Sequence, residues 1–172
     1  MLEDFSFYFI HRLLHTKSKY LPLYQMIHKQ HHEHVNPISV AAEDIHPVEF
    51  FFNLCGTMFG PCVLGSKMHY WTLIIWGLVR IQQSLDAHCG YEFPWSPFGL
   101  IPFGASATYH HWHHTKNVGN YSSYMTIWDT IFDSNSDYYE KYPEGVQINE
   151  KWKYETYKMN MYNLIVCNIN SN

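Results

Sequence analysis

The sequence predicts an all-α protein that is integrated in a membrane through a hydrophobic helical hairpin. Three histidine clusters have spacings of three and four residues, which place side chains on one face of a helix. Two largely apolar stretches lie between the second and third clusters. Prolines, glycines and asparagines separate these segments and mark where helices end. Together these observations favour helices throughout, with the histidines in a helical cap beside the hairpin.

The first two histidine clusters are expected on separate helices. Residues 4–16 form a helix with aromatic side chains along one side and carry the first cluster. Pro22 permits a new helix start, so residues 23–34 are expected to hold the second cluster on a helix. Pro37 ends that helix and begins a connector to the apolar stretches.

The two apolar stretches predict the hairpin. Residues 48–65 carry Glu49 as their single formal charge, and residues 70–79 are uncharged up to Arg80. The first stretch is at the lower edge of membrane-spanning length, and the second is too short unless Arg80 and Gln82 are buried in protein. We therefore expect a hairpin that dips into or crosses a bilayer. A buried hairpin of a soluble protein is the alternative.

The remaining segments complete one domain and a tail. The second arm of the hairpin continues to about His88, and residues 91–104 are too rich in proline and glycine for a long regular element. The third cluster follows on a short helix, and an apolar helical pattern resumes over residues 123–132. The expected division is a histidine-rich domain over residues 1–143 and a polar C-terminal extension over residues 144–172, with no inferred chemistry in the extension.

The three clusters together predict a dimetal site, because helical spacing aims each cluster at a common point and eight imidazoles can enclose two ions. Neutral imidazole suits Fe, Zn, Cu and Ni, and a nitrogen-rich set without thiolates is unlike cysteine-rich structural zinc modules. Adventitious metal binding by solvated histidines is the alternative. His34 and His69 are expected at the surface, and His46 is expected to order a turn. The candidate ligands are His11, His15, His28, His31, His32, His110, His113 and His114.

Composition limits the other classes of function. At 172 residues the chain is about one domain, and 18% aromatic against 15% charged residues suits burial in protein or lipid. The net charge is −4 and no basic block occurs, so no nucleic-acid partner is expected. Four cysteines without a C-x-x-C pair argue against a disulfide scaffold.

Six motifs occur in a consistent order between about Glu3 and Tyr139. The chain with these motifs resembles the fatty acid hydroxylase superfamily, also called the sterol desaturase family, and its strongest likeness is to the C4-methylsterol oxidases. The motifs are Phe7-Tyr8-x-x-His11-Arg12-x-x-His15, His28-Lys29-x-His31-His32-Glu33, Ile45-His46-Pro47-x-Glu49, Asp86-x-His88-x-Gly90-Tyr91-x-x-Pro94, His110-x-x-His113-His114, and Gly119-Asn120-Tyr121-Ser122-Ser123 followed by Trp128-Asp129.

The resemblance implies a non-haem diiron monooxygenase of the endoplasmic reticulum membrane. Such an enzyme uses O₂ and electrons from NAD(P)H, delivered by cytochrome b5 or its reductase, to oxidise the C4 methyl group of sterol intermediates towards a carboxylate. The eight histidines would then be ligands of two Fe ions, with Zn possible in a purified form, and His88 would be a ninth ligand. No catalytic residue is expected beyond the metal ligands.

Departures from the family pattern leave alternatives open. Family members usually begin with further membrane-spanning helices, so the chain is expected to be truncated at its N-terminus. His111 stands where the family commonly has an acidic residue, so His111 could replace His110 as a ligand. Ser84 replaces a histidine typical of the fatty-acid branch, which favours the sterol branch. Fatty acid or sphingolipid hydroxylation, sterol desaturation and a noncatalytic metal-binding membrane protein remain the competing functions.

Residues around the ligands are expected to complete the site. Carboxylates should accept from the non-coordinating imidazole nitrogens, and an apolar pocket should hold the rigid lipid. Basic residues beside the first two clusters place them on the cytosolic side by the positive-inside tendency, namely Arg12, Lys17, Lys19 and Lys29. The nearest carboxylates in sequence are Glu33, Glu43, Asp44, Asp86 and Asp129. The aromatic candidates are Phe50 to Phe52, Trp71, Trp76, Tyr91, Phe93 and Trp95.

Overall fold

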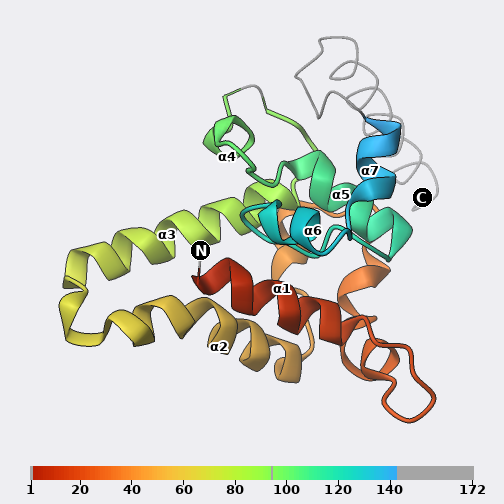
Figure 1. The fold of residues 1–172 in the computed structure, drawn as a ribbon, viewed down its shortest axis with the longest axis horizontal. Coiled ribbons are helices and arrows are strands. Elements are labelled where there is room, and N and C mark those ends of the chain that lie inside the picture. Colours follow the sequence, from red (N-terminus) through yellow and green to blue (C-terminus); the bar gives the residue numbers. More distant parts are fainter. Residues whose placement is uncertain (1, 94, 143–172) are drawn as a thin grey trace, which may run out of the picture.

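The computed structural model describes residues 2–93 and 95–142, and this part of the chain is mostly helical, as predicted (Figure 1). Within it the β pairing is an isolated bridge between Gly104 and Met125. The expected extension over residues 144–172 lies outside the described residues. The helices are α1 (Leu2–Leu14), the π-helix η1 (Tyr24–His28), the 3₁₀-helices η2 (His31–Glu33) and η3 (Ser39–Glu43), α2 (Pro47–Leu64), the 3₁₀-helix η4 (Gly65–Lys67), α3 (Tyr70–Ala87), α4 (Pro97–Leu100), α5 (Ala107–Lys116), α6 (Ile127–Ile131) and α7 (Ser136–Lys141).

Histidine side chains begin both long apolar helices. The Val48 N–H donates to the His46 ring at 3.2 Å at the start of α2, where Pro47 fits the first helical position. At the start of α3 the Trp71 N–H donates to the His69 ring at 3.3 Å. An acceptor side chain at this position satisfies a backbone N–H that the helix itself leaves unpaired. His46 therefore caps a helix and does not order the turn expected for it, and His69, exposed as expected, caps α3 in the same way.

The long helices α2 and α3 extend to one side of the molecule and are joined there by η4 (Figure 1). Helix α1 packs along α2, whereas α3 contacts η3 and α5. Large apolar side chains on both helices are exposed, among them Phe51, Phe59 and Val63 on α2 and Trp71, Ile75 and Leu78 on α3. Among the described helices, the one that is long and apolar enough to cross a membrane covers residues 47–67, with 11% of its apolar window buried.

The two polar residues near the end of the second apolar stretch differ in burial. Arg80 is 11% exposed and forms an ion pair with Glu3 of α1. Gln82 is exposed. The second stretch was expected to span a membrane only if both residues are buried in protein, and this holds for Arg80 and not for Gln82.

Two helices expected from the sequence are broken in the structure. Residues 23–34 form η1 and η2 in place of one α-helix, because the Lys29 N–H donates to the Tyr24 carbonyl at 2.8 Å and closes a wide π turn. Of residues 123–132 only α6 is α-helical. The backbone N–H groups of Tyr124 and Met125 donate instead to the Asp4 carboxylate, both at 3.1 Å. A side-chain acceptor from α1 therefore replaces the helical hydrogen bonds there.

The interior of the described chain is polar where the histidines meet and apolar only in small patches. Tyr109 and Tyr138 pack with Ala105 into a buried cluster beside α5. The described cysteines, Cys55, Cys62 and Cys89, are free thiols. The nine candidate histidines are all buried, at most 8% exposed. Imidazoles therefore fill the space that aliphatic side chains occupy in an ordinary core.

Candidate metal centre

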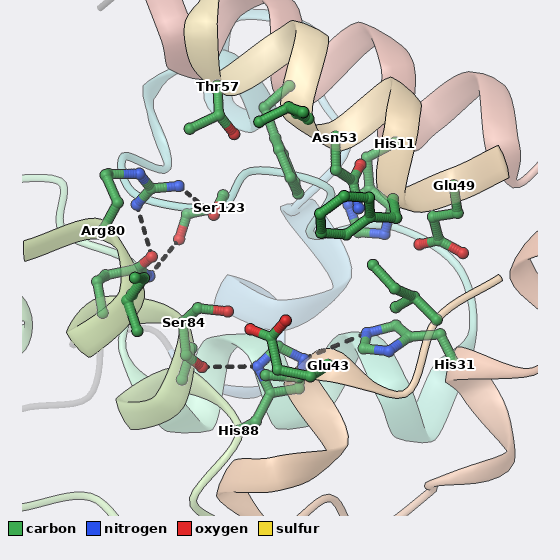
Figure 2. A pocket seen from close by; sticks show the side chains of 18 of the residues that line it. His11, His31, Glu43, Glu49, Asn53, Thr57, Arg80, Ser84, His88 and Ser123 are labelled. Atoms are coloured by element: carbon green, nitrogen blue, oxygen red, sulfur yellow. Dashed lines mark hydrogen bonds between the residues drawn. The ribbon is translucent and has the colours of Figure 1, made fainter. Parts of the chain in front are cut away.

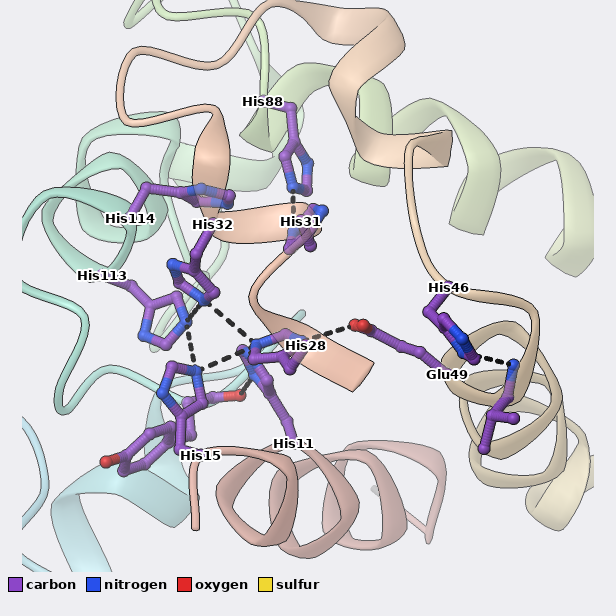
Figure 3. Close-up of polar contacts among 12 residues, drawn as sticks. His11, His15, His28, His31, His32, His46, Glu49, His88, His113 and His114 are labelled. Atoms are coloured by element: carbon purple, nitrogen blue, oxygen red, sulfur yellow. Dashed lines mark hydrogen bonds and ion pairs between the residues drawn. The ribbon is translucent and has the colours of Figure 1, made fainter. Parts of the chain in front are cut away.

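The structure brings all nine candidate histidines together in two adjoining groups, and eight of them are labelled in Figure 3. Within each group one ring nitrogen of every histidine lies within 4.8 Å of those of the others, so each group could close around a metal ion. His111 lies outside both groups, so of the two alternatives on α5 it is His110 that joins the candidate ligands. The first imidazole group contains His11, His15, His28, His32 and His113, and the second contains His31, His88, His110 and His114.

The expectation that each sequence cluster points at one place is wrong for two of the three. His28 and His32 enter the first imidazole group, while His31 between them enters the second. Similarly, His113 enters the first group and its neighbour His114 the second. Consecutive residues in a helical turn point about 100° apart, so an adjacent histidine pair separates naturally towards two centres. The second and third clusters therefore bridge the two groups.

Backbone carbonyls fix the protonation of three imidazoles. His11 Nδ1 donates to the Tyr121 carbonyl at 2.7 Å, and His113 Nδ1 donates to the Gly119 carbonyl at 2.6 Å. His88 Nδ1 donates to the Ser84 carbonyl at 2.8 Å. Because a carbonyl oxygen can only accept, Nδ1 carries the proton in each neutral ring and Nε2 presents a lone pair.

The Nε2 atoms of neighbouring imidazoles lie close together in both groups, an arrangement that suits a bound cation. His11 Nε2 lies 3.1 Å from His28 Nε2, and His28 Nδ1 is 2.7 Å from a Glu49 carboxylate oxygen. In the second group, His110 Nε2 lies 2.9 Å from His88 Nε2. Where both rings carry their proton on Nδ1, the two Nε2 lone pairs cannot hydrogen-bond each other, and a bound cation would make their convergence favourable. The donor set therefore fits a metal ion that prefers imidazole nitrogen.

Burial keeps these histidines neutral. It lowers the pKa of His11 and of His88 to about 4, and it lowers the pKa of His32 to about 3. Burial, reinforced by the neighbouring imidazoles, also places the pKa of His110 and of His113 well below the ordinary value. Neutral imidazole is the form that binds metal. The site is therefore ready to coordinate at neutral pH without losing protons from these rings.

Glu49 is the carboxylate beside the imidazoles, and sequence reasoning did not include it among the expected acceptors. Its side chain is 2% exposed and accepts from His28 Nδ1 (Figure 3). Glu49 could have been singled out in the sequence because it is the single formal charge in an apolar stretch. Of the expected carboxylates, Glu43 is exposed but lines a cavity together with His31 and His88 (Figure 2). Glu33 and Asp44 are exposed, Asp86 accepts from Ser96 at 2.7 Å, and Asp129 is buried and accepts from backbone N–H groups.

Asp129 supports the site one layer further out. Its two carboxylate oxygens accept from the backbone N–H groups of Tyr121 at 2.8 Å and Ser122 at 2.7 Å. The same turn places the Gly119 carbonyl at His113. A Cβ at Gly119 would lie 2.6 Å from the Ser134 carbonyl at a φ of +74°, so only glycine fits this turn without strain. The turn thus holds two of the carbonyls that orient the first imidazole group.

A cavity of about 220 Å³ reaches both groups from between α2 and α3 (Figure 2). Its floor includes His11 and His28 of the first group together with three members of the second. Of the expected aromatic wall, Phe50 lines the cavity. Ile45, Leu54 and Ile81 are other apolar lining residues. A lipid that enters between the two apolar helices would therefore meet both imidazole groups.

Replacing the carboxyl group of Glu49 is expected to weaken metal binding. In Glu49→Gln the amide oxygen can still accept from His28 Nδ1, but the carboxyl group, which can ionise beside a bound cation and raise ligand basicity, is lost. We expect metal affinity to fall by about 10- to 100-fold. A chelator competition titration with Fe²⁺ measures this change. Glu33→Gln, at an exposed acidic residue, is the control that should bind as the wild type does. Equal affinities for the two variants would contradict the role of Glu49.

Comparison with known families and relatives agrees with the motifs. The profile of the fatty acid hydroxylase family matches residues 1–134. The methylsterol monooxygenase erg25B of Aspergillus fumigatus is 44% identical over 137 residues, which cover 78% of this chain and 45% of that protein. Methylsterol monooxygenase 2-1 of Arabidopsis thaliana is 39% identical over 154 residues, covering 80% of this chain and 54% of that protein.

A relative with a different name is about equally similar. The very-long-chain aldehyde decarbonylase GL1-8 of Oryza sativa subsp. indica is 42% identical over 142 residues, which cover 80% of this chain and 50% of that protein. The chain thus spans about half the length of the curated relatives it matches. No solved structure matches it.

Proposed function

Since this chain belongs to the fatty acid hydroxylase family, we propose that it forms the metal centre of a membrane monooxygenase that oxidises the C4 methyl group of sterol intermediates. The observation that carries the proposal is the convergence of nine buried imidazoles into two adjoining groups beside a cavity. The methylsterol monooxygenases among the relatives support the sterol as substrate. Ser84, where the fatty-acid branch has a histidine, supports the same choice.

The proposed cofactor is a pair of Fe ions, one in each imidazole group, with Zn as a substitute in purified protein. When bound, iron would supply the O₂ activation that oxidation of an unactivated methyl group needs and that no side chain provides. The chain's own part is to present Nε2 lone pairs. It also holds the Nδ1 protons on fixed acceptors, as at Tyr121, Ser84 and Gly119. A lipid in the cavity would exclude water from the face of the imidazole groups that lines it.

The cavity supports a rigid apolar substrate. Its volume of about 220 Å³ is below the roughly 300–1,000 Å³ of pockets that enclose a whole drug-sized ligand. The ring that carries the methyl group would therefore occupy the cavity, and the rest of the lipid would extend between α2 and α3. Apolar lining residues such as Leu54 and Ile81 suit the ring system. Asn53 and Thr57 provide polar groups for orientation.

The proposed location is the endoplasmic reticulum membrane, with the imidazole groups on the cytosolic side. The α2–α3 hairpin would lie in the bilayer, because its outward side chains are apolar and exposed. Lys17, Lys19 and Lys29 near the imidazole groups fit the cytosolic side. Electrons from NAD(P)H would arrive there through cytochrome b5 or its reductase.

The hairpin is expected to keep the protein in the membrane fraction through carbonate extraction. Exposed apolar side chains on α2 and α3 would lose their lipid contacts in the aqueous extract, at about 25 cal/mol per Å². The measurement is immunoblotting of extracted microsomes, together with protease digestion of sealed vesicles. The segment around His28 should be cleaved from outside. Release of the chain into the carbonate supernatant, or protection of that segment, would contradict the proposed placement.

Lipid profiling with complementation tests the proposed substrate. Cells that lack the gene should accumulate 4-methyl or 4,4-dimethyl sterols, and expression of the protein in these cells should restore C4 demethylation. Unchanged sterols with loss of 2-hydroxylated fatty acyl chains would favour the fatty acid or sphingolipid hydroxylase alternative. Unchanged lipids at normal protein levels would instead support the noncatalytic metal-binding alternative.

A further inference from the structure

Arg80 is a cation at the end of an apolar stretch, and the metal ligands do not account for it. Its guanidinium is paired with Glu3 of α1, and both side chains are 11% exposed. It also donates to Gln83 Oε1 at 2.6 Å and to Ser123 Oγ at 3.0 Å (Figure 2). The planar fork of arginine allows these separate acceptors to be held at once.

Gln83 closes the same network. It is 1% exposed and donates from Nε2 to the Ser123 carbonyl at 2.7 Å. Arg80 and Gln83 therefore join three segments: α1, α3 and the chain after α5. A buried ion pair is often no more stabilising than apolar residues of the same size, so stability alone is a weak reason for this arrangement.

The network ends beside the two carbonyls that orient one imidazole in each group. Gln83 immediately precedes Ser84, whose carbonyl accepts from His88 of the second imidazole group. Ser123 lies two residues after Tyr121, whose carbonyl accepts from His11 of the first group. Any change in the distance between α3 and residue 123 would thus rotate one of these rings relative to the other.

We propose that Arg80 is a positioning residue for the metal centre: with Gln83 and Ser123 it fixes the spacing between the Ser84 and Tyr121 carbonyls and so the relative orientation of His88 and His11. This inference rests on the proposed metal centre. It adds that metal binding depends on the network of Arg80, Gln83 and Ser123, which follows neither from the set of ligands nor from membership of the family. A lysine at position 80 can pair with Glu3, but its single ammonium cannot reproduce the planar fork to Gln83 and Ser123.

The test is Co²⁺ titration of the detergent-purified full chain, followed by its visible absorption and by chelator competition. Arg80→Lys and Ser123→Ala should each lower Co²⁺ affinity by about 10-fold or more and shift the absorption bands, with unchanged far-ultraviolet circular dichroism. The double variant Arg80→Lys/Ser123→Ala should be no worse than the poorer single variant, because both remove the same link. Gln82→Leu, at an exposed position on the same helix, is the matched control and should bind as the wild type does.

The outcomes separate this inference from the proposed function. Wild-type affinity and wild-type bands in Arg80→Lys would overturn the positioning role while leaving the metal centre intact. Fully additive losses in the double variant would overturn it too, since independent effects do not form one network. Failure of the wild-type protein to bind Co²⁺ would reject the metal centre itself, and the role of Arg80 with it.

Discussion

The variant His113→Ala is expected to lose metal from the first imidazole group, whereas His111→Ala retains it. Both residues lie on α5, but His113 is 0% exposed and belongs to the group, while His111 lies outside it. Loss of a ligand should cost more than the roughly 10- to 100-fold that a lost supporting hydrogen bond costs. We therefore expect metal affinity at this group to fall by more than about 100-fold.

Metal analysis of the two purified variants by inductively coupled plasma mass spectrometry checks this result. Circular dichroism should show that the helices of both variants remain, so that a lower metal content reflects the missing ligand. His69→Ala, at the start of α3, provides a second histidine control far from α5 in the sequence. Similar metal content in all three variants would refute the two groups as the binding site.

The variant Asp129→Asn is expected to destabilise the protein by about 2 kcal/mol. Asp129 is fully buried, and each of its carboxylate oxygens accepts from a backbone N–H, of Tyr121 or of Ser122. An asparagine amide turns a donor towards one of these N–H groups and leaves it unsatisfied. For a chain of this length, the loss corresponds to a decrease in Tm of roughly 4–8 °C.

Thermal unfolding in detergent, followed by circular dichroism, measures this decrease. Asp133→Asn is the matched control, because Asp133 lies in the same region but is exposed. The Tyr121 carbonyl orients His11, so Asp129→Asn should also weaken metal binding. An unchanged Tm in Asp129→Asn would show that the turn does not depend on this carboxylate.

The sequence predicted the helical fold, the apolar stretches that become α2 and α3, and eight of the nine histidines that gather, because their signals are local; His88 was expected only from the family resemblance. Spacings of three and four residues bring histidines to one side of a turn, and an apolar stretch between polar breaks defines a long helix. Which histidine joins which group was not predicted. Adjacent histidines separate because consecutive helical residues point about 100° apart, and in the second cluster the chain also passes through the π turn at η1, which a hydrogen bond from Lys29 to Tyr24 produces and which no residue pattern marks.

The acceptors around the rings were the least predictable part of the site. Three of them are backbone carbonyls, those of Tyr121, Ser84 and Gly119, and every residue has a carbonyl. Their positions depend on long-range contacts such as Asp4 with the backbone of Tyr124. Glu49 was visible as a charge in an apolar stretch, but its pairing with His28 joins elements that only the folded chain brings together.

The bridging of both groups by the second and third clusters has a consequence for how the centre assembles. His31 and His32 are neighbours on one short segment, and so are His113 and His114 on α5, yet each pair serves two groups. Capture of a first ion would order these segments and lower the entropic cost of capturing a second. Metal binding should therefore be cooperative. The centre should be found either without metal or with both ions bound, in preference to states with one ion.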